Sequence, residues 1–242
     1  MRIRLFTIPN LLTLMNLLCG SFAVVAALMY NDLTLAFWLI VAGIVLDFFD
    51  GFVARLLHSS SAIGVQLDSL ADVITSGLAP AAVLWQVCLQ TEPCWLPETW
   101  KLGYGVFVLA AFSALRLAKF NIDETQTVEF CGLPTPAGSL LCASLGMLWQ
   151  QGAVALSSDG VLLIAVLTSL LLVSPIRMFA LKFHGFGWRG NEVRYLFLLA
   201  SIVLIIILRT YAIPVIIVLY IVVSAVRWLC MRSGNPDKAP KA

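Results

Sequence analysis

Four aspartates lie close together in a stretch of the chain that is otherwise mostly apolar. Asp47 and Asp50 are three residues apart, and Asp68 and Asp72 are four apart, in a protein with only 13 acidic residues. Residues three or four apart share one face of a helix, so each pair can point the same way. Four converging carboxylates would repel one another at neutral pH unless a cation lay between them. Ligation by oxygen alone suits Mg²⁺, Mn²⁺ or Ca²⁺, and we therefore expect a divalent metal site.

Small residues and one arginine accompany the aspartates. Gly51, Ala54 and Gly64 would let a ligand approach the backbone closely. Arg55 offers a guanidinium, which matches the geometry of a phosphate. Together these residues predict a site that handles phosphate. The alternative is that the acids are merely solvated at helix ends, but solvation alone does not explain why they keep to one face while the opposite faces stay apolar.

The composition of the whole chain places this site in a lipid bilayer. Hydrophobic residues make up 61% and charged residues 12%, with a mean hydropathy of +0.97. Soluble domains carry roughly a quarter charged residues, so the composition predicts an integral membrane protein. The formal net charge is only +2, and no basic run suggests a nucleic-acid partner. The six cysteines lack metal-ligand spacing, which argues against zinc and thiol redox chemistry.

Hydropathy predicts an all-α fold with eight transmembrane helices. The predicted ranges are 8–30, 33–57, 64–89, 101–121, 134–153, 160–182, 191–209 and 211–231. We expect the first range to be a retained span and not a cleaved signal, because its apolar run is long enough to cross a bilayer, about 20 residues.

The distribution of Lys and Arg predicts the orientation. Of the 15 basic residues, only Lys101 and Arg209 fall on the side of this topology that lacks the termini. The positive-inside rule therefore places both termini in the cytoplasm, which suits a multi-pass protein of the cytoplasmic (plasma) membrane. The second and third helices would be antiparallel neighbours joined by the short link at 58–62. The two aspartate pairs could then meet at the cytoplasmic surface.

The aspartate pattern resembles the motif of the CDP-alcohol phosphotransferase family. The chain matches every fixed position of that motif: Asp47, Asp50, Gly51, Ala54, Arg55, Gly64, Asp68 and Asp72. The tail at 233–242 is short and polar, which predicts disorder. The resemblance implies a six-helix core, expected at 1–185, with two additional transmembrane helices at 186–232. It also implies a homodimer.

Four further stretches narrow the resemblance to one branch of the family, the integral-membrane phosphatidylserine synthases. They lie at 67–81, 113–121, 130–138 and 173–179. The implied reaction moves the phosphatidyl group of CDP-diacylglycerol to the hydroxyl of L-serine, giving phosphatidylserine and CMP. Lys119 stands where arginine is more usual in this branch, a change that keeps the charge.

The same resemblance assigns roles to the motif residues. Asp47, Asp50, Asp68 and Asp72 would share the ligation of two divalent ions, Mg²⁺ or Mn²⁺, with Ca²⁺ as a further candidate. Asp72 would also be the general base for the serine hydroxyl. CDP-diacylglycerol would be bound by Asp50, Gly51, Ala54, Arg55 and Gly64.

The first helix carries a polar stripe that could line the same cavity. Asn10, Thr13 and Asn16 follow one another at intervals of three, and we include Asn10 and Thr13 among the candidates for binding CDP-diacylglycerol. Ordinary hydrogen bonding between helices is the alternative explanation for such a stripe.

The candidates for binding the acceptor or its phosphate come from later in the chain. Arg116, Lys119 and Asn121 fall at the inner end of the fourth predicted helix, and Arg177 at the inner end of the sixth. Thr135 is a weaker candidate, because its turn also reads as the start of a helix. The alternative for the basic residues is anchoring at the cytoplasmic membrane surface.

Two other functions are compatible with four clustered aspartates in a membrane protein. The same chemistry could use glycerol 3-phosphate, inositol phosphate or choline, but a phosphorylated acceptor should call for a denser cluster of arginines. A metal or ion transporter could also use the aspartates. Transporter sites, however, usually lie near the bilayer midplane on broken helices, whereas these aspartates fall at predicted helix ends.

Overall fold

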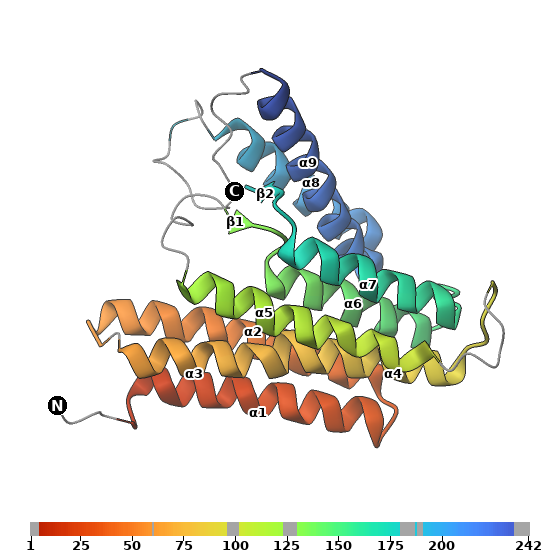
Figure 1. The fold of residues 1–242 in the computed structure, drawn as a ribbon, viewed down its shortest axis with the longest axis horizontal. Coiled ribbons are helices and arrows are strands. Elements are labelled where there is room, and N and C mark those ends of the chain that lie inside the picture. The colour runs from red at the N-terminus through yellow and green to blue at the C-terminus, as the bar shows by residue number, and fades with distance from the viewer. Residues whose placement is uncertain are drawn as a thin grey trace.

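The computed structural model describes residues 5–59, 61–95, 102–122, 130–179, 187 and 191–234. Within these ranges the fold is almost entirely helical (Figure 1). The α-helices are α1 (Ile8–Leu28), α2 (Leu33–Leu56), α3 (Ala62–Asp72), α4 (Ala79–Gln90), α5 (Val108–Ile122), α6 (Thr135–Gln150), α7 (Ser158–Val173), α8 (Glu192–Leu208) and α9 (Ala212–Gly234). A π-helix at Val73–Leu78 joins α3 to α4, and 3₁₀ helices at Leu102–Phe107 and Arg209–Tyr211 precede α5 and α9. The two-residue strands β1 (Phe130–Cys131) and β2 (Arg177–Met178) pair antiparallel.

The structure confirms an all-α fold with helices suited to a membrane. Five helical stretches are long and apolar enough to span a bilayer: Ile8–Leu28, Leu33–Leu56, Ala62–Gln90, Gly103–Ile122 and Glu192–Cys230. Helix is present in each of the eight predicted ranges, although α7 is a shorter apolar helix. The protein is therefore an integral membrane protein, while the number of spans and their orientation stay predictions.

One predicted helix is too long. The range 160–182 was expected to be a single helix, but α7 ends at Val173 and an extended segment follows. Pro175 explains the stop, because a proline disfavours helical backbone at the residue before it, here Ser174, whose ψ is 153°. Arg177 consequently lies in β2 and not at the inner end of a helix. The tail expected at 233–242 begins within α9, and its residues from 235 onward lie outside the described ranges.

The helices α1 to α7 run lengthwise beside one another, whereas α8 and α9 stand at a steep angle to them (Figure 1). The hydrophobic core is formed where α2, α4 and α6 meet, by fully buried side chains such as Phe37, Ile40, Val83, Leu84 and Leu148. This packing places the start of α1, the end of α2 and the start of α3 at one end of the bundle.

The π-helix fixes the position of α3 against the first two helices. Thr75 in this segment is fully buried, and its hydroxyl donates to the Asn16 carbonyl at 3.0 Å. Gly20 of α1 and Gly43 of α2 make room for it: a Cβ at Gly20 would lie 2.4 Å from Thr75 Oγ1. The close approach holds the preceding turn, which carries Asp72, beside α1. Single π-helical turns of this kind are frequent at functional sites.

Candidate active site

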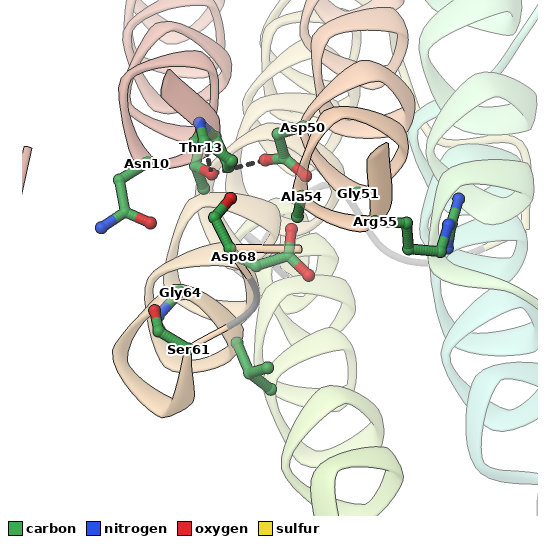
Figure 2. A pocket seen from close by; sticks show the side chains of 12 residues that line it. Asn10, Thr13, Asp50, Gly51, Ala54, Arg55, Ser61, Gly64 and Asp68 are labelled. Carbon is green, nitrogen blue, oxygen red and sulfur yellow. Dashed lines mark hydrogen bonds between the residues drawn. The ribbon is translucent and has the colours of Figure 1, made fainter. Parts of the chain in front are cut away.

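Six of the eight residues of the sequence motif line one pocket at the end of the bundle, and the other two, Asp47 and Asp72, are not part of its lining (Figure 2). The pocket is a cavity of about 190 Å³ between the start of α1, the end of α2 and the start of α3. Its lining includes every residue expected to bind CDP-diacylglycerol, and Asp68 as well: Asn10, Thr13, Asp50, Gly51, Ala54, Arg55, Gly64 and Asp68. Pro9, Ser59, Ser61 and Val65 complete it.

Local capping determines where the helices around the pocket begin. The Thr7 hydroxyl accepts from Asn10 N at 3.4 Å at the start of α1, and the Ser61 hydroxyl accepts from Gly64 N at 3.1 Å at the start of α3. Both are the usual side-chain caps of an exposed helix terminus. A Cβ at residue 64 would lie 3.2 Å from both Asn10 Oδ1 and Ser61 Oγ, so a larger side chain there would require both neighbours to shift. The floor at Gly51 is open, and a Cβ there would meet nothing within 4 Å.

Three of the four aspartates converge. Asp47, Asp50 and Asp68 each offer a carboxylate oxygen, and the three oxygens lie within 4.8 Å of one another. Asp68 Oδ1 is buried and accepts no hydrogen bond from any described residue. Three converging carboxylates, one of which has a buried oxygen without a partner, fit a hard divalent cation such as Mg²⁺ or Mn²⁺.

Hydrogen bonds from α1 orient two of the aspartates. The Thr13 hydroxyl donates to Asp50 Oδ2 at 2.5 Å (Figure 2). The Asn16 amide donates to Asp72 Oδ1 at 3.2 Å. The polar stripe on α1 therefore faces the carboxylates. Asp72 is buried and is not one of the three converging aspartates, although it lies within electrostatic range of Asp47 and Asp68.

Arg55 reaches the pocket from a different direction. It lies beyond Gly51 and Ala54, and its guanidinium is turned away from Asp50 (Figure 2). A ligand in contact with both the aspartates and Arg55 would therefore have to extend across Gly51 and Ala54.

The residues expected to bind the acceptor do not form a single cluster. The Arg116 guanidinium donates to the hydroxyl of the buried Thr135 at 2.6 Å and lies within electrostatic range of Asp72. The Asn121 amide donates instead to Ser69 Oγ at 2.8 Å, on α3, and Lys119 is exposed. Arg177 is held in β2, opposite Cys131 of β1.

The sequence interpretation missed two serines of the pocket. Ser61 could have been found, because a serine just before an apolar helical run is a common N-cap. Ser59 lines the pocket with a buried hydroxyl that has no partner among the described residues. It lies in a three-serine link between helices, where nothing in the sequence distinguishes one serine from the next.

Comparison with known proteins identifies the family. The sequence profile of the CDP-alcohol phosphatidyltransferases matches residues 6–174, which include the whole pocket. The chain belongs to the CDP-alcohol phosphatidyltransferase family. It is accordingly an enzyme of this family, and the transporter considered above is not favoured.

Relatives of this phosphatidyltransferase share one name. The CDP-diacylglycerol–serine O-phosphatidyltransferase of Bacillus subtilis is 33% identical over 178 residues, covering 74% of this chain and 93% of the relative. The protein of that name from Helicobacter pylori is 31% identical over 230 residues, 93% of this chain and 92% of the relative. The protein of that name from Mycobacterium tuberculosis is 33% identical over 256 aligned positions, which cover 99% of this chain and 86% of the relative.

Proposed function

We propose that this phosphatidyltransferase moves the phosphatidyl group of CDP-diacylglycerol to the hydroxyl of L-serine, releasing CMP. The observation that carries the proposal is the pocket, in which the predicted donor-binding residues gather beside three converging carboxylates. Relatives from three organisms that bear this activity as their name, each aligned with most of the chain, support serine as the acceptor.

The metal would be held by Asp47, Asp50 and Asp68, and we include Asp72 as a further ligand of a two-ion site. When bound there, the ions would neutralise the pyrophosphate of the donor and stabilise the charge on the departing CMP. The protein's own contribution is to hold the ligands still. Thr13 does so for Asp50 through a short hydrogen bond that leaves the second carboxylate oxygen available.

Asp72 is the proposed general base. The Asn16 amide restrains its rotation through Oδ1, which leaves Oδ2 to accept the proton of the serine hydroxyl. The serine oxygen then forms a bond to the phosphorus that carries the diacylglycerol. The bond from that phosphorus to the CMP oxygen breaks, and CMP leaves with the electron pair. A positioned base of this kind contributes about 10²–10⁴-fold to the rate.

The remaining contacts divide between donor and acceptor. The open floor at Gly51 and Ala54 would receive the pyrophosphate and cytidine, with Arg55 at its far side, while the acyl chains stay in the bilayer. Arg116 is the leading candidate for the serine carboxylate, because Thr135 holds its guanidinium and Asp72 lies within electrostatic range. Arg177, Lys119 and Asn121 are proposed as outer acceptor contacts.

The wider arrangement is proposed on the same basis. Eight spans with both termini in the cytoplasm would place the pocket at the cytoplasmic membrane surface, where CDP-diacylglycerol and serine can meet. The division into a core at 1–185 and an additional helix pair at 186–232, and assembly as a homodimer, are further parts of the proposal.

Acceptor-dependent release of CMP tests this function. The purified protein, with Mn²⁺ or Mg²⁺ and CDP-diacylglycerol, should release CMP with L-serine and not with glycerol 3-phosphate, inositol phosphate or choline. Asp72→Asn should lower the rate about 10²–10⁴-fold. Release with another acceptor in place of serine would show that serine is not the acceptor. Full activity of Asp72→Asn would show that Asp72 is not the general base.

A further inference from the structure

The C-terminal helix α9 makes one buried polar contact with the segment that carries Arg177. The Tyr220 side chain is 8% exposed, and its hydroxyl donates to the Phe179 carbonyl at 3.0 Å. Phe179 follows β2 directly and is itself buried, so this hydrogen bond fixes the backbone two residues after Arg177. A buried tyrosine hydroxyl normally has such a partner, because a buried hydroxyl without a hydrogen bond costs free energy. The same cost applies to the carbonyl that accepts from it.

The strand held in this way is connected to the Arg116 side of the site. Residues 130–133 form a continuous bridge to it: β1 pairs with β2, Gly132 N donates to the Ile176 carbonyl at 2.9 Å, and Leu133 N donates to the Leu171 carbonyl at 2.9 Å. Two residues later Thr135 begins α6 and accepts the hydrogen bond from Arg116. Gly132 cannot be replaced in this path, because its φ is +81° and a Cβ would lie 2.2 Å from the Leu172 carbonyl oxygen.

The packing of α9 brings it against both parts of this path. It packs against β2, which carries Arg177, and against α6, whose first residue, Thr135, accepts the hydrogen bond from Arg116. A single side chain of α9 is therefore bonded to the segment that carries Arg177, and that segment is joined through β1 to the residue that holds Arg116. None of the residues lining the aspartate pocket comes from α8 or α9.

We propose that Tyr220 is a positioning residue for the acceptor, through which the C-terminal helix pair sets the affinity for the acceptor and leaves that for the donor unchanged. The inference rests on the proposed function, because it takes Arg116 and Arg177 as acceptor contacts. The hydroxyl is the part that matters. The Tyr220 ring packs against Phe179 at 4.9 Å and Phe197 at 5.8 Å between centroids, and a phenylalanine would keep that packing.

The decisive comparison is between Tyr220→Phe and Tyr211→Phe in the full-length protein. Tyr211 offers a control from the same region: it lies just before α9 and is more exposed, and its hydroxyl also donates to a backbone carbonyl, that of Ala153 at 3.2 Å. Tyr220→Phe should raise the KM for L-serine about threefold to tenfold, the range expected for one net hydrogen bond. The KM for CDP-diacylglycerol should stay within about twofold of the wild-type value, and Tyr211→Phe should change neither.

A merely structural role would give a different result. It would lower the melting temperature of Tyr220→Phe and leave the KM for serine unchanged, or raise the KM for both substrates together, and either outcome would overturn the inference. The wild-type protein separates this failure from that of the proposed function. If it releases CMP only with another acceptor, the proposal of serine as the acceptor is wrong. The KM for that other acceptor, compared with the KM for CDP-diacylglycerol, then decides the role of Tyr220. If it releases CMP with no acceptor, both proposals fall.

Discussion

The two ends of the helix bundle treat their polar side chains in opposite ways. At the asparagine end, formed by Asn31, Thr34, Gln86, Gln90 and Gln150, the side chains bond to one another. Asn31 Oδ1 accepts from Gln90 at 2.8 Å and from Gln86 at 3.2 Å. The Gln150 oxygen accepts from both Thr34 N and the Thr34 hydroxyl. This network joins the α1–α2 turn to α4 and α6 and needs nothing from outside the protein.

The aspartate end, formed by Asp47, Asp50, Asp68 and the pocket around them, leaves polar atoms unmatched. Asp68 Oδ1 and Ser59 Oγ, both from residues that line the pocket, are buried without a hydrogen-bond partner among the described residues. Buried polar atoms are nearly always satisfied in native proteins, so unmatched ones at a pocket indicate a ligand. The difference suits the proposed roles of the two ends: the polar side chains of one end stabilise the fold, and those of the other are arranged for a ligand.

The largest expected effect comes from Asp68→Asn. Removing one converging carboxylate should weaken metal binding and cost several kcal/mol of transition-state stabilisation, about 10³-fold in CMP release. Because the variant also relieves repulsion between carboxylates, its melting temperature in chelator should equal or exceed that of the wild type. Activity and thermal unfolding of the same preparations measure both effects.

Asp159→Asn is the matched control at the other end. Asp159 Oδ2 accepts from Trp95 N at 2.6 Å and Cys94 N at 3.1 Å, so this carboxylate already has its partners within the protein. The control should melt at a lower temperature and keep its activity. If Asp68→Asn also lost stability in chelator and kept its activity, the contrast between the two ends would be wrong.

Thr13→Val should have the next largest effect. The substitution keeps the shape of the side chain and removes the hydroxyl that bonds Asp50 at 2.5 Å. A hydrogen bond to a charged group contributes about 1.5–3 kcal/mol, so the concentration of Mg²⁺ or Mn²⁺ for half-maximal activity should rise about tenfold or more. A metal titration at saturating donor measures the shift. No shift would mean that Asp50 does not depend on α1 for its orientation.

The aspartate end was predictable from the sequence because its parts are close along the chain. Asp47 to Asp72 lie on two consecutive helices, and helical periodicity alone places each pair on one face. The short link between the helices then brings the pairs together. The polar stripe of α1, also read from helical spacing, contributes Asn10 and Thr13 to the same pocket.

The acceptor side was less predictable because it depends on contacts between distant segments. The β1–β2 pair joins residue 131 to residue 177, and Tyr220 bonds to Phe179 across 41 positions. The sixth predicted helix extended past Pro175 because hydropathy alone set its boundaries and the residues on both sides of the proline are mostly apolar. The π-helix also escaped prediction, since it depends on the space that Gly20 and Gly43 leave for Thr75.

Gly51→Ala tests whether the floor of the aspartate end is shaped for a ligand. A Cβ there meets nothing within 4 Å in the protein, and alanine is favoured over glycine in a helix by about 0.5–1 kcal/mol, so the variant should be more stable. The added methyl would nevertheless occupy the space proposed for the pyrophosphate. We expect the KM for CDP-diacylglycerol to rise about fivefold, as for overpacking of about 1 kcal/mol. A donor KM equal to that of the wild type would place the donor elsewhere.

The smallest effect on activity should come from Gln150→Ala at the asparagine end. This change removes the acceptor of two hydrogen bonds from Thr34 and the amide that donates to the Asn31 carbonyl at 2.5 Å. These bonds are exposed to solvent, which can replace them, so the loss in the free energy of unfolding should be near 1 kcal/mol. The KM values for donor and acceptor should both stay within about twofold of the wild type, because no polar atom at the aspartate end changes its partner. A selective rise in either KM would show that the asparagine end also serves the reaction, and the division between the two ends would fail.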